Sequence, residues 1–237
     1  MLLYLRWSVP WVRVAVAALL VATLIELVHR DAWLLWPLEG TAVALLAGAA
    51  AWCLDEQAGA VVDVTPRGLA WRTAARAPAP ALLAGVWLVT VWHARDSLFG
   101  HAGAVLVQGL AALAAGTAWA TSRRAAGNPM PGLALAATVI PAGAGWALVR
   151  PLPDQLPVFP YGTATPGQWA TSLVAWSAVA AASLVVLALE LAEARWWLRR
   201  RRPVTAGGPG RPDGGTTGVG HAGRSTWAAS RSGATRQ

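Results

Sequence analysis

Six long apolar stretches, separated by short polar or arginine-bearing segments, occupy most of residues 1–200. Backbone amides find no water inside a bilayer, so a segment that crosses one must form a helix of about 20 apolar residues. The pattern therefore predicts an all-α polytopic membrane protein with six transmembrane helices. We expect the spans at about Pro10–Val28, Pro37–Leu54, Ala79–Ala94, Ala102–Ser122, Gly132–Val149 and Gln168–Leu189.

The composition agrees with a membrane protein. Hydrophobic residues make up 56% of the chain and charged residues only 13%, whereas a soluble domain carries about 25% charged residues. The formal net charge is +8, and all 19 basic residues are arginine. A strongly basic chain can indicate a nucleic-acid partner, but here the arginines follow the predicted membrane topology. We therefore expect the arginines to contact the lipid bilayer, and we expect no nucleic-acid partner.

The arginines alternate between rich and poor loops. If the N-terminus is cytoplasmic, the outer side holds only Arg30, Arg95 and Arg150. The inner side then holds many more, namely Arg6, Arg13, Arg67, Arg72, Arg76, Arg123, Arg124, Arg195 and Arg199 to Arg202. This asymmetry follows the positive-inside rule. It predicts that both termini are cytoplasmic and that the protein is a multi-pass component of a bacterial inner (plasma) membrane.

The chain divides into two parts by composition. Residues 1–202 hold all six predicted spans and form one transmembrane domain. Residues 203–237 consist largely of Gly, Pro, Ser, Thr and Arg, with almost no large apolar side chain. Such a segment cannot bury a core, so we expect a disordered, Gly/Arg-rich cytoplasmic tail.

The loop after the second span is the longest predicted inner loop, residues 55–78. It begins with Asp55-Glu56 and continues to Thr65-Pro66, which resembles a helix start with Thr65 as the N-cap and Pro66 at the first helical position. The residues that follow predict a short helix on or just under the membrane surface. Arg72 and Arg76 are four residues apart, so they share one face of it.

Small residues recur at four-residue spacing inside two spans. Gly40, Ala44 and Gly48 line one face of the second span, and Ala104, Ala112, Gly116 and Ala120 line one face of the fourth. Such faces let helix backbones approach closely in lipid. In a chain this rich in alanine the spacing can also arise by chance, so close packing and coincidence remain alternatives.

Several ionisable residues lie within or at the edge of the spans, where charge is costly. Glu26, Glu39 and His93 fall on the predicted outer side and could line an outer cavity or offer ligands to a metal such as zinc. No pair has the spacing of a metal motif on one helix, so headgroups or solvent are the favoured surroundings, and we expect no bound metal. Gln108 is the most central polar side chain, and its expected role is a hydrogen bond between helices.

Catalytic signatures are missing from the sequence. There is no Gly-x-Ser-x-Gly, no His-Glu-x-x-His and no cluster of acids within the predicted membrane. A phosphate-binding loop of the Gly-x-x-x-x-Gly-Lys type cannot occur, since the chain has no lysine. We therefore expect neither an enzyme nor a cofactor site, and any ATP-driven process must use an ATPase on another chain.

The second span and its following loop resemble a known family. The segments Ala-Trp-Cys-Leu-Asp-Glu-Gln-Ala at 51–58 and Val-Asp-Val-Thr-Pro-Arg-Gly-Leu-Ala-Trp-Arg at 62–72 are similar to small actinobacterial membrane proteins described as ABC transporter permeases of the ABC-2 type. The resemblance implies a six-helix subunit that pairs with itself or a sibling and is served by a separate ATPase. It also implies that the inner loop contacts that ATPase, through Asp55, Glu56, Thr65, Pro66, Arg67, Arg72 and Arg76.

Two functions follow as alternatives. The first is a permease-like transmembrane subunit of an ABC-type export system. The second is a non-transport membrane scaffold or assembly factor that recruits a partner through its arginine-rich tail. An intramembrane enzyme is disfavoured, because no paired catalytic groups lie at a common depth.

Overall fold

A computed structural model describes residues 9–56, 69–128, 130–150, 155, 157–160 and 164–200, with the side chains at 36, 69 and 193–200 excepted. All of these residues belong to one compact unit, Met1–Arg201. The described residues form helices and contain no strand. The predicted all-α class is thereby confirmed. The predicted tail at 203–237 lies outside the described residues.

Six long helices lie at the six predicted spans. They are α2 (Trp11–Arg30), α3 (Leu35–Cys53), α6 (Pro78–His93), α7 (Ala102–Ala125), α8 (Pro131–Val149) and α9 (Pro166–Arg200). In the described parts of the connections lie three short helices: the 3-10 helices η1 (Ala32–Leu34) and η2 (Arg95–Ser97), and the predicted helix α5 (Leu69–Arg76). The boundaries agree with the prediction within a few residues, except that α9 continues well beyond Leu189.

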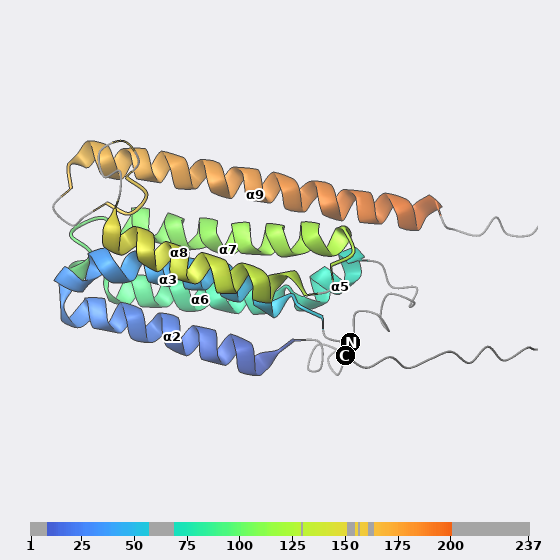
Figure 1. Ribbon diagram of the computed structural model, residues 1–237, viewed down its shortest axis with the longest axis horizontal. Coiled ribbons are helices and arrows are strands. Elements are labelled where there is room, and N and C mark those ends of the chain that lie inside the picture. Colours follow the sequence, from blue (N-terminus) through green and yellow to red (C-terminus); the bar gives the residue numbers. More distant parts are fainter. Residues whose placement is uncertain are drawn as a thin grey trace, which may run out of the picture. The chain divides into compact units, whose positions relative to one another are not determined.

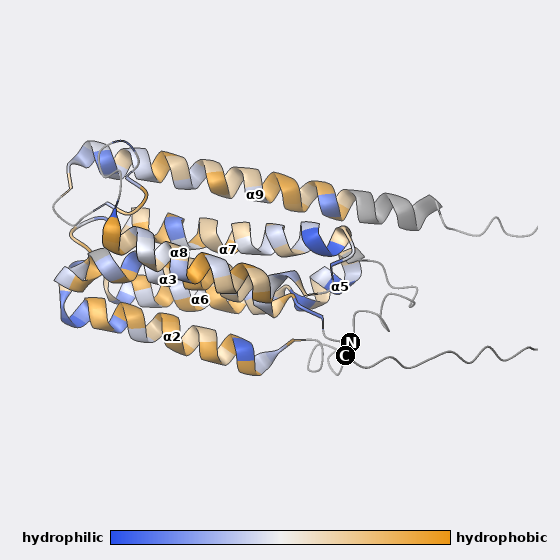
Figure 2. Cartoon of the chain, in the orientation of Figure 1, coloured by the Kyte–Doolittle hydropathy of each residue, from blue (hydrophilic) through white to orange (hydrophobic). Residues whose placement is uncertain are grey.

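Five of these helices are long and apolar enough to cross a membrane. The second of these five spans counts α5 and α6 together, as Ala70–His93, and α3 contributes a shorter apolar helix, Pro37–Cys53. Figure 2 shows hydrophobic residues along most of each helix and hydrophilic residues gathered mainly near the helix ends. The length and composition of these helices indicate a membrane protein.

The helix α3 lies at the centre of the bundle, where it contacts α2, α6, α7 and α8. The long helix α9 packs mainly along α7 (Figure 1). Successive long helices run in alternating directions, so the bundle has two ends. We call the end formed by residues 29–35, 94–101, 150 and 157–160 the outer end, and the end formed by residues 53–56, 69–77 and 123–128 the inner end, after their predicted sides of the membrane.

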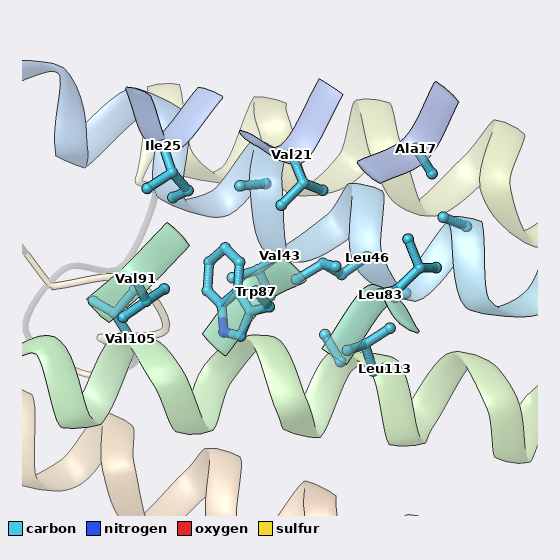
Figure 3. Packing of buried hydrophobic residues seen from close by; sticks show 14 of the residues in the cluster. Ala17, Val21, Ile25, Val43, Leu46, Leu83, Trp87, Val91, Val105 and Leu113 are labelled. Carbon is cyan, nitrogen blue, oxygen red and sulfur yellow. The ribbon is translucent and has the colours of Figure 1, made fainter. Parts of the chain in front are cut away.

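Trp87 occupies the middle of the core. Its side chain is fully buried among Val43, Leu46, Leu83, Val91, Val105 and Leu113, as Figure 3 shows. The indole Nε1 donates a hydrogen bond to the carbonyl oxygen of Leu106 at 3.1 Å. The ring lies directly against Gly109 of α7, where any side chain would overlap it. The indole therefore packs between helices, as expected of a tryptophan in mid-span.

The small-residue face of α3 packs against α8. A methyl group on Gly40 would meet Ala147, and one on Gly48 would meet Ala136 at 3.1 Å. On the α7 side, a methyl group on Gly116 would overlap the backbone of Ala47. Close packing of the predicted small-residue faces is thus confirmed at these positions, and coincidence is excluded there. In lipid such contact is a main source of helix association, since water exclusion no longer drives it.

Candidate functional site

A buried carboxylate at the inner end joins three arginines. Glu56 Oε1 accepts a hydrogen bond from Arg76 Nη2 at 3.0 Å, and Glu56 Oε2 accepts one from Arg72 Nη1 at 3.3 Å and another from Arg124 Nη2. The Glu56 side chain is only 6% exposed, and the three arginine side chains are between 5% and 12% exposed. The ion pairs therefore lie inside the protein and are poorly screened by solvent.

The elements that carry these groups explain their convergence. The helix α3 ends at Cys53, so the next residues of the chain leave the helix axis at the inner end. Arg72 and Arg76 lie four residues apart on α5 and present adjacent guanidinium groups to that point. Arg124 comes from the last turn of α7, where a cation also interacts favourably with the helix dipole.

Asp55, next to Glu56 in the sequence, binds the start of α8 instead of an arginine. Its Oδ1 accepts a hydrogen bond from the backbone N–H of Gly132 at 2.6 Å, and its Oδ2 accepts one from Leu133 at 2.9 Å. Pro131, at the first position of α8, has no N–H to satisfy. Asp55 thus caps the start of α8 from a segment distant in sequence, and its negative charge suits the positive end of the helix dipole.

We call Asp55, Glu56, Arg72, Arg76 and Arg124 the inner charge cluster. Arg76 strengthens it further, because its Nη1 donates to the carbonyl oxygens of Leu54 at 3.0 Å and Asp55 at 3.4 Å. Through these bonds the cluster connects the end of α3 with α5, α7 and the start of α8. Removing one partner from a buried ion pair is strongly destabilising, so the cluster fixes the relative positions of four helices.

Four of the seven residues predicted to contact an ATPase come together in this cluster. Arg72 and Arg76 point toward Glu56, whereas the Asp55 side chain points toward the start of α8, and all four residues have most of their surface covered. The other three, Thr65, Pro66 and Arg67, lie outside the described residues. Sequence reasoning missed Arg124 as the third cation, although its predicted place on the inner side was the available signal.

At the outer end, two of the three polar residues singled out in the sequence meet. Glu26 Oε1 accepts a hydrogen bond from Arg30 Nε at 3.0 Å, and Glu26 Oε2 lies 3.7 Å from His93 Nε2. The ring of His93 lies 4.6 Å from that of His29, centroid to centroid. These side chains are largely exposed, with 42% exposure at Glu26 and 62% at His93. This agrees with the expectation of headgroup or solvent surroundings.

Glu39 is separate from this pair. It lies in the second turn of α3 with 0% exposure, beside the fully buried Gln108 of α7. Gln108 Nε2 donates a hydrogen bond to Ser172 Oγ of α9 at 3.2 Å. The bond between helices that the sequence predicted for Gln108 is therefore confirmed. Glu39 is thus buried inside the bundle, whereas Glu26 and His93 lie exposed at its outer end.

Two further outer residues stack on each other. The imidazole of His101 lies parallel to the indole of Trp169, with 4.1 Å between ring centroids and an interplanar angle of 11°. Partial burial lowers the pKa of His101, because the protonated ring loses hydration. Trp169 is 3% exposed and packs into the core. Among the described residues, no group of three or more His, Cys, Asp or Glu could hold a metal ion.

Comparison with known proteins adds no family to this description. The chain matches no family model, no curated protein and no solved structure. The class that the fold and its apolar helices define is a helical membrane protein. Within the described residues, buried polar groups lie at both ends of α3: the inner charge cluster at one end and Glu39 with Gln108 at the other.

Proposed function

We propose that the protein crosses a bacterial plasma membrane six times, with its inner end in the cytoplasm. The five long apolar helices support five of these crossings. For the sixth, α3 has 19 residues, which at 1.5 Å per residue give about 28 Å, close to the thickness of the hydrocarbon core. Its position between four other helices suits a span that is covered by protein rather than lipid.

We further propose that it is a permease-like transmembrane subunit of an ABC-type export system. The observation that carries this proposal is the inner charge cluster, which couples the short helix α5 to α3, α7 and α8. A membrane subunit driven by a separate ATPase needs an element at its cytoplasmic end that passes motion into several helices at once. The cluster gives α5 that connection.

In this proposal the ATPase contacts α5 and not the charged side chains. The charges of Arg72 and Arg76 are turned toward Glu56. The residue of α5 that is exposed is instead the small, uncharged Ala74. ATP binding on the partner would displace α5, and the cluster would carry α3, α7 and α8 with it. Substrate would pass along the interface between two such membrane subunits, identical or related.

This proposal is tested at the face of α5. The Ala74→Glu variant places a charged, bulky side chain on that face without altering the inner charge cluster. We expect it to insert and fold normally but to lose a co-purifying ATPase in mild detergent. The matched control is Ala126→Glu, which makes the same change at an exposed position of the inner end, directly after α7. The control should retain the ATPase.

The outcomes separate the two functions. If both variants retain the ATPase, α5 is not its contact surface. If the unmodified protein purifies without any ATP-binding-cassette subunit, the permease proposal fails, and a scaffold or assembly factor becomes the better description. In that case, deletion of residues 203–237 should remove whatever other membrane or cytoplasmic partner accompanies it.

A further inference from the structure

Three buried oxygen atoms near the outer end have no hydrogen-bond partner among the described residues. They are Glu39 Oε1, Glu39 Oε2 and Gln108 Oε1. Both residues are 0% exposed. An ionised carboxylate inside a membrane protein normally accepts several hydrogen bonds or pairs with a cation, since burial without such partners is very costly. Neither oxygen of Glu39 accepts such a bond from a described residue, and the side-chain amide of Gln108 is the neutral polar group beside it.

The hydrogen bonds around Gln108 have a fixed direction. Ser172 Oγ donates to the carbonyl oxygen of Val158 at 3.0 Å, which also accepts from Trp176 Nε1 at 3.0 Å. Ser172 has only one proton, so it must accept, and the amide group of Gln108 must donate to it. This series of hydrogen bonds therefore ends on α7 at Gln108, whose amide oxygen Oε1 has no donor among the described residues. A proton on Glu39 supplies a donor where three oxygen atoms lack one.

The charged groups on the surrounding described elements donate no hydrogen bond to the Glu39 carboxyl group. Arg150, which follows α8, attracts the Glu39 carboxyl electrostatically, but its Nε donates to the carbonyl oxygen of Ala147 at 3.0 Å. From α2 and α6, the ionisable groups Glu26 and His93 interact with each other at the outer end. From α7 and α9 come the neutral groups of Gln108 and Ser172.

The site is also closed to larger ligands. Next to Glu39, Gly40 is in such close contact that a methyl group there would meet Ala147 and approach Phe159 to 3.1 Å. Phe159 is itself 7% exposed and belongs to the connection that precedes α9.

We propose that Glu39 is a proton-binding site within the bundle, held as a neutral carboxylic acid beside Gln108 and Ser172 while α3, α7 and α9 are packed together. Separation of these helices admits water to the carboxyl group and lets it release the proton to that water. The packed arrangement therefore binds one proton more than the separated one. By linkage, alkaline pH favours separation and acidic pH favours packing.

Infrared spectroscopy of the full-length protein tests this assignment. A neutral carboxylic acid gives a C=O stretching band that an ionised carboxylate does not have. We expect this band at neutral pH in the unmodified protein, and we expect Glu39→Gln to remove it. The control Glu26→Gln, which changes an exposed carboxylate near the same end, should leave the band unchanged. Glu39→Gln should also make thermal stability in detergent less dependent on pH between 6 and 9.

A second variant keeps the test decisive if Glu39→Gln fails to insert. Gln108→Met retains the acid but removes its amide neighbour, so the band should persist at a shifted frequency. Absence of the band from the unmodified protein at neutral pH would overturn the proposal. So would a band that neither Glu39→Gln nor Gln108→Met alters. Either result would leave Glu39 as an ionised group paired with Arg150.

Discussion

At the scale of single residues, the size of a side chain decides how closely α3 meets its neighbours. Gly116 lies against the backbone of Ala47, and Gly132 lies against the backbone of Ala51. Backbone atoms cannot relieve a clash by changing rotamer as a side chain can. Even a methyl group at these positions therefore requires whole helices to move. Glu39, on the same helix, is fully buried.

Substitution of Gly116 by valine should therefore destabilise the bundle strongly. We expect the free energy of unfolding to fall by about 1–3 kcal/mol or more, since overpacked cores are strained by this amount. Gly85→Val is the matched control, because a side chain there meets no atom within 4 Å. Thermal unfolding of both variants in detergent is the measurement. Equal midpoints for the two variants would contradict the close α3–α7 contact.

The buried carboxylate of Glu56 is the second decisive residue. Glu56→Gln removes the negative charge shared by three guanidinium groups, and loss of one partner from a buried ion pair costs about 3–5 kcal/mol. We expect a loss of stability in this range, measured by denaturant unfolding of the detergent-solubilised protein. Asp96→Asn serves as the control, because that side chain is 85% exposed and its loss should change little.

A double variant distinguishes the ion pair from a simple packing effect. Arg124→Gln added to Glu56→Gln removes one of the mutually repelling cations, so the two losses should not add. Non-additivity is expected for residues within one network. Strict additivity of the two substitutions would show that Arg124 and Glu56 contribute independently, against the contact seen between them.

At the scale of helices, the sequence predicted the positions of the helices along the chain better than the contacts between them. Apolar length placed all six long helices, and the spacing of Arg72 and Arg76 placed α5 and its charged face. The capping of α8 by Asp55 was not foreseen. The two partners are distant along the chain, and no local pattern marks an N-cap that another segment supplies.

The candidate site shows the same limit. Positive-inside reasoning placed the arginines at one end of the bundle but could not say which of them share Glu56, because that depends on helix rotation. Glu39 was assigned to the correct end, yet its burial came from the face that α3 presents to α7. The hydrophobic pattern of α3 does not show how the helix is rotated about its axis, because the helix is apolar on nearly every side. The pairing of buried polar groups therefore required the three-dimensional structure.

At the scale of the whole molecule, the proposed topology places the two ends of the bundle on opposite sides of a membrane. Cys53 is the only cysteine and is fully buried, so its replacement by alanine provides a background for single-cysteine labelling. In intact cells a membrane-impermeant maleimide should label Asp96→Cys, at the outer end. It should not label Ala126→Cys until the membrane is opened. Labelling of both positions from outside, or of Ala126→Cys alone, would refute the six-span arrangement with cytoplasmic termini.

The central position of α3 also has a consequence for the time course of synthesis. This helix is the second of the six to leave the ribosome, whereas the residue beside Glu39, Gln108, follows 69 positions later. At about 5–20 residues per second, that interval lasts roughly 3–14 seconds. During it the acid of α3 has no Gln108 and its glycines have no α7 or α8 to cover them. The nascent chain must therefore either delay the release of α3 into lipid or shelter it against another protein until the fourth helix arrives.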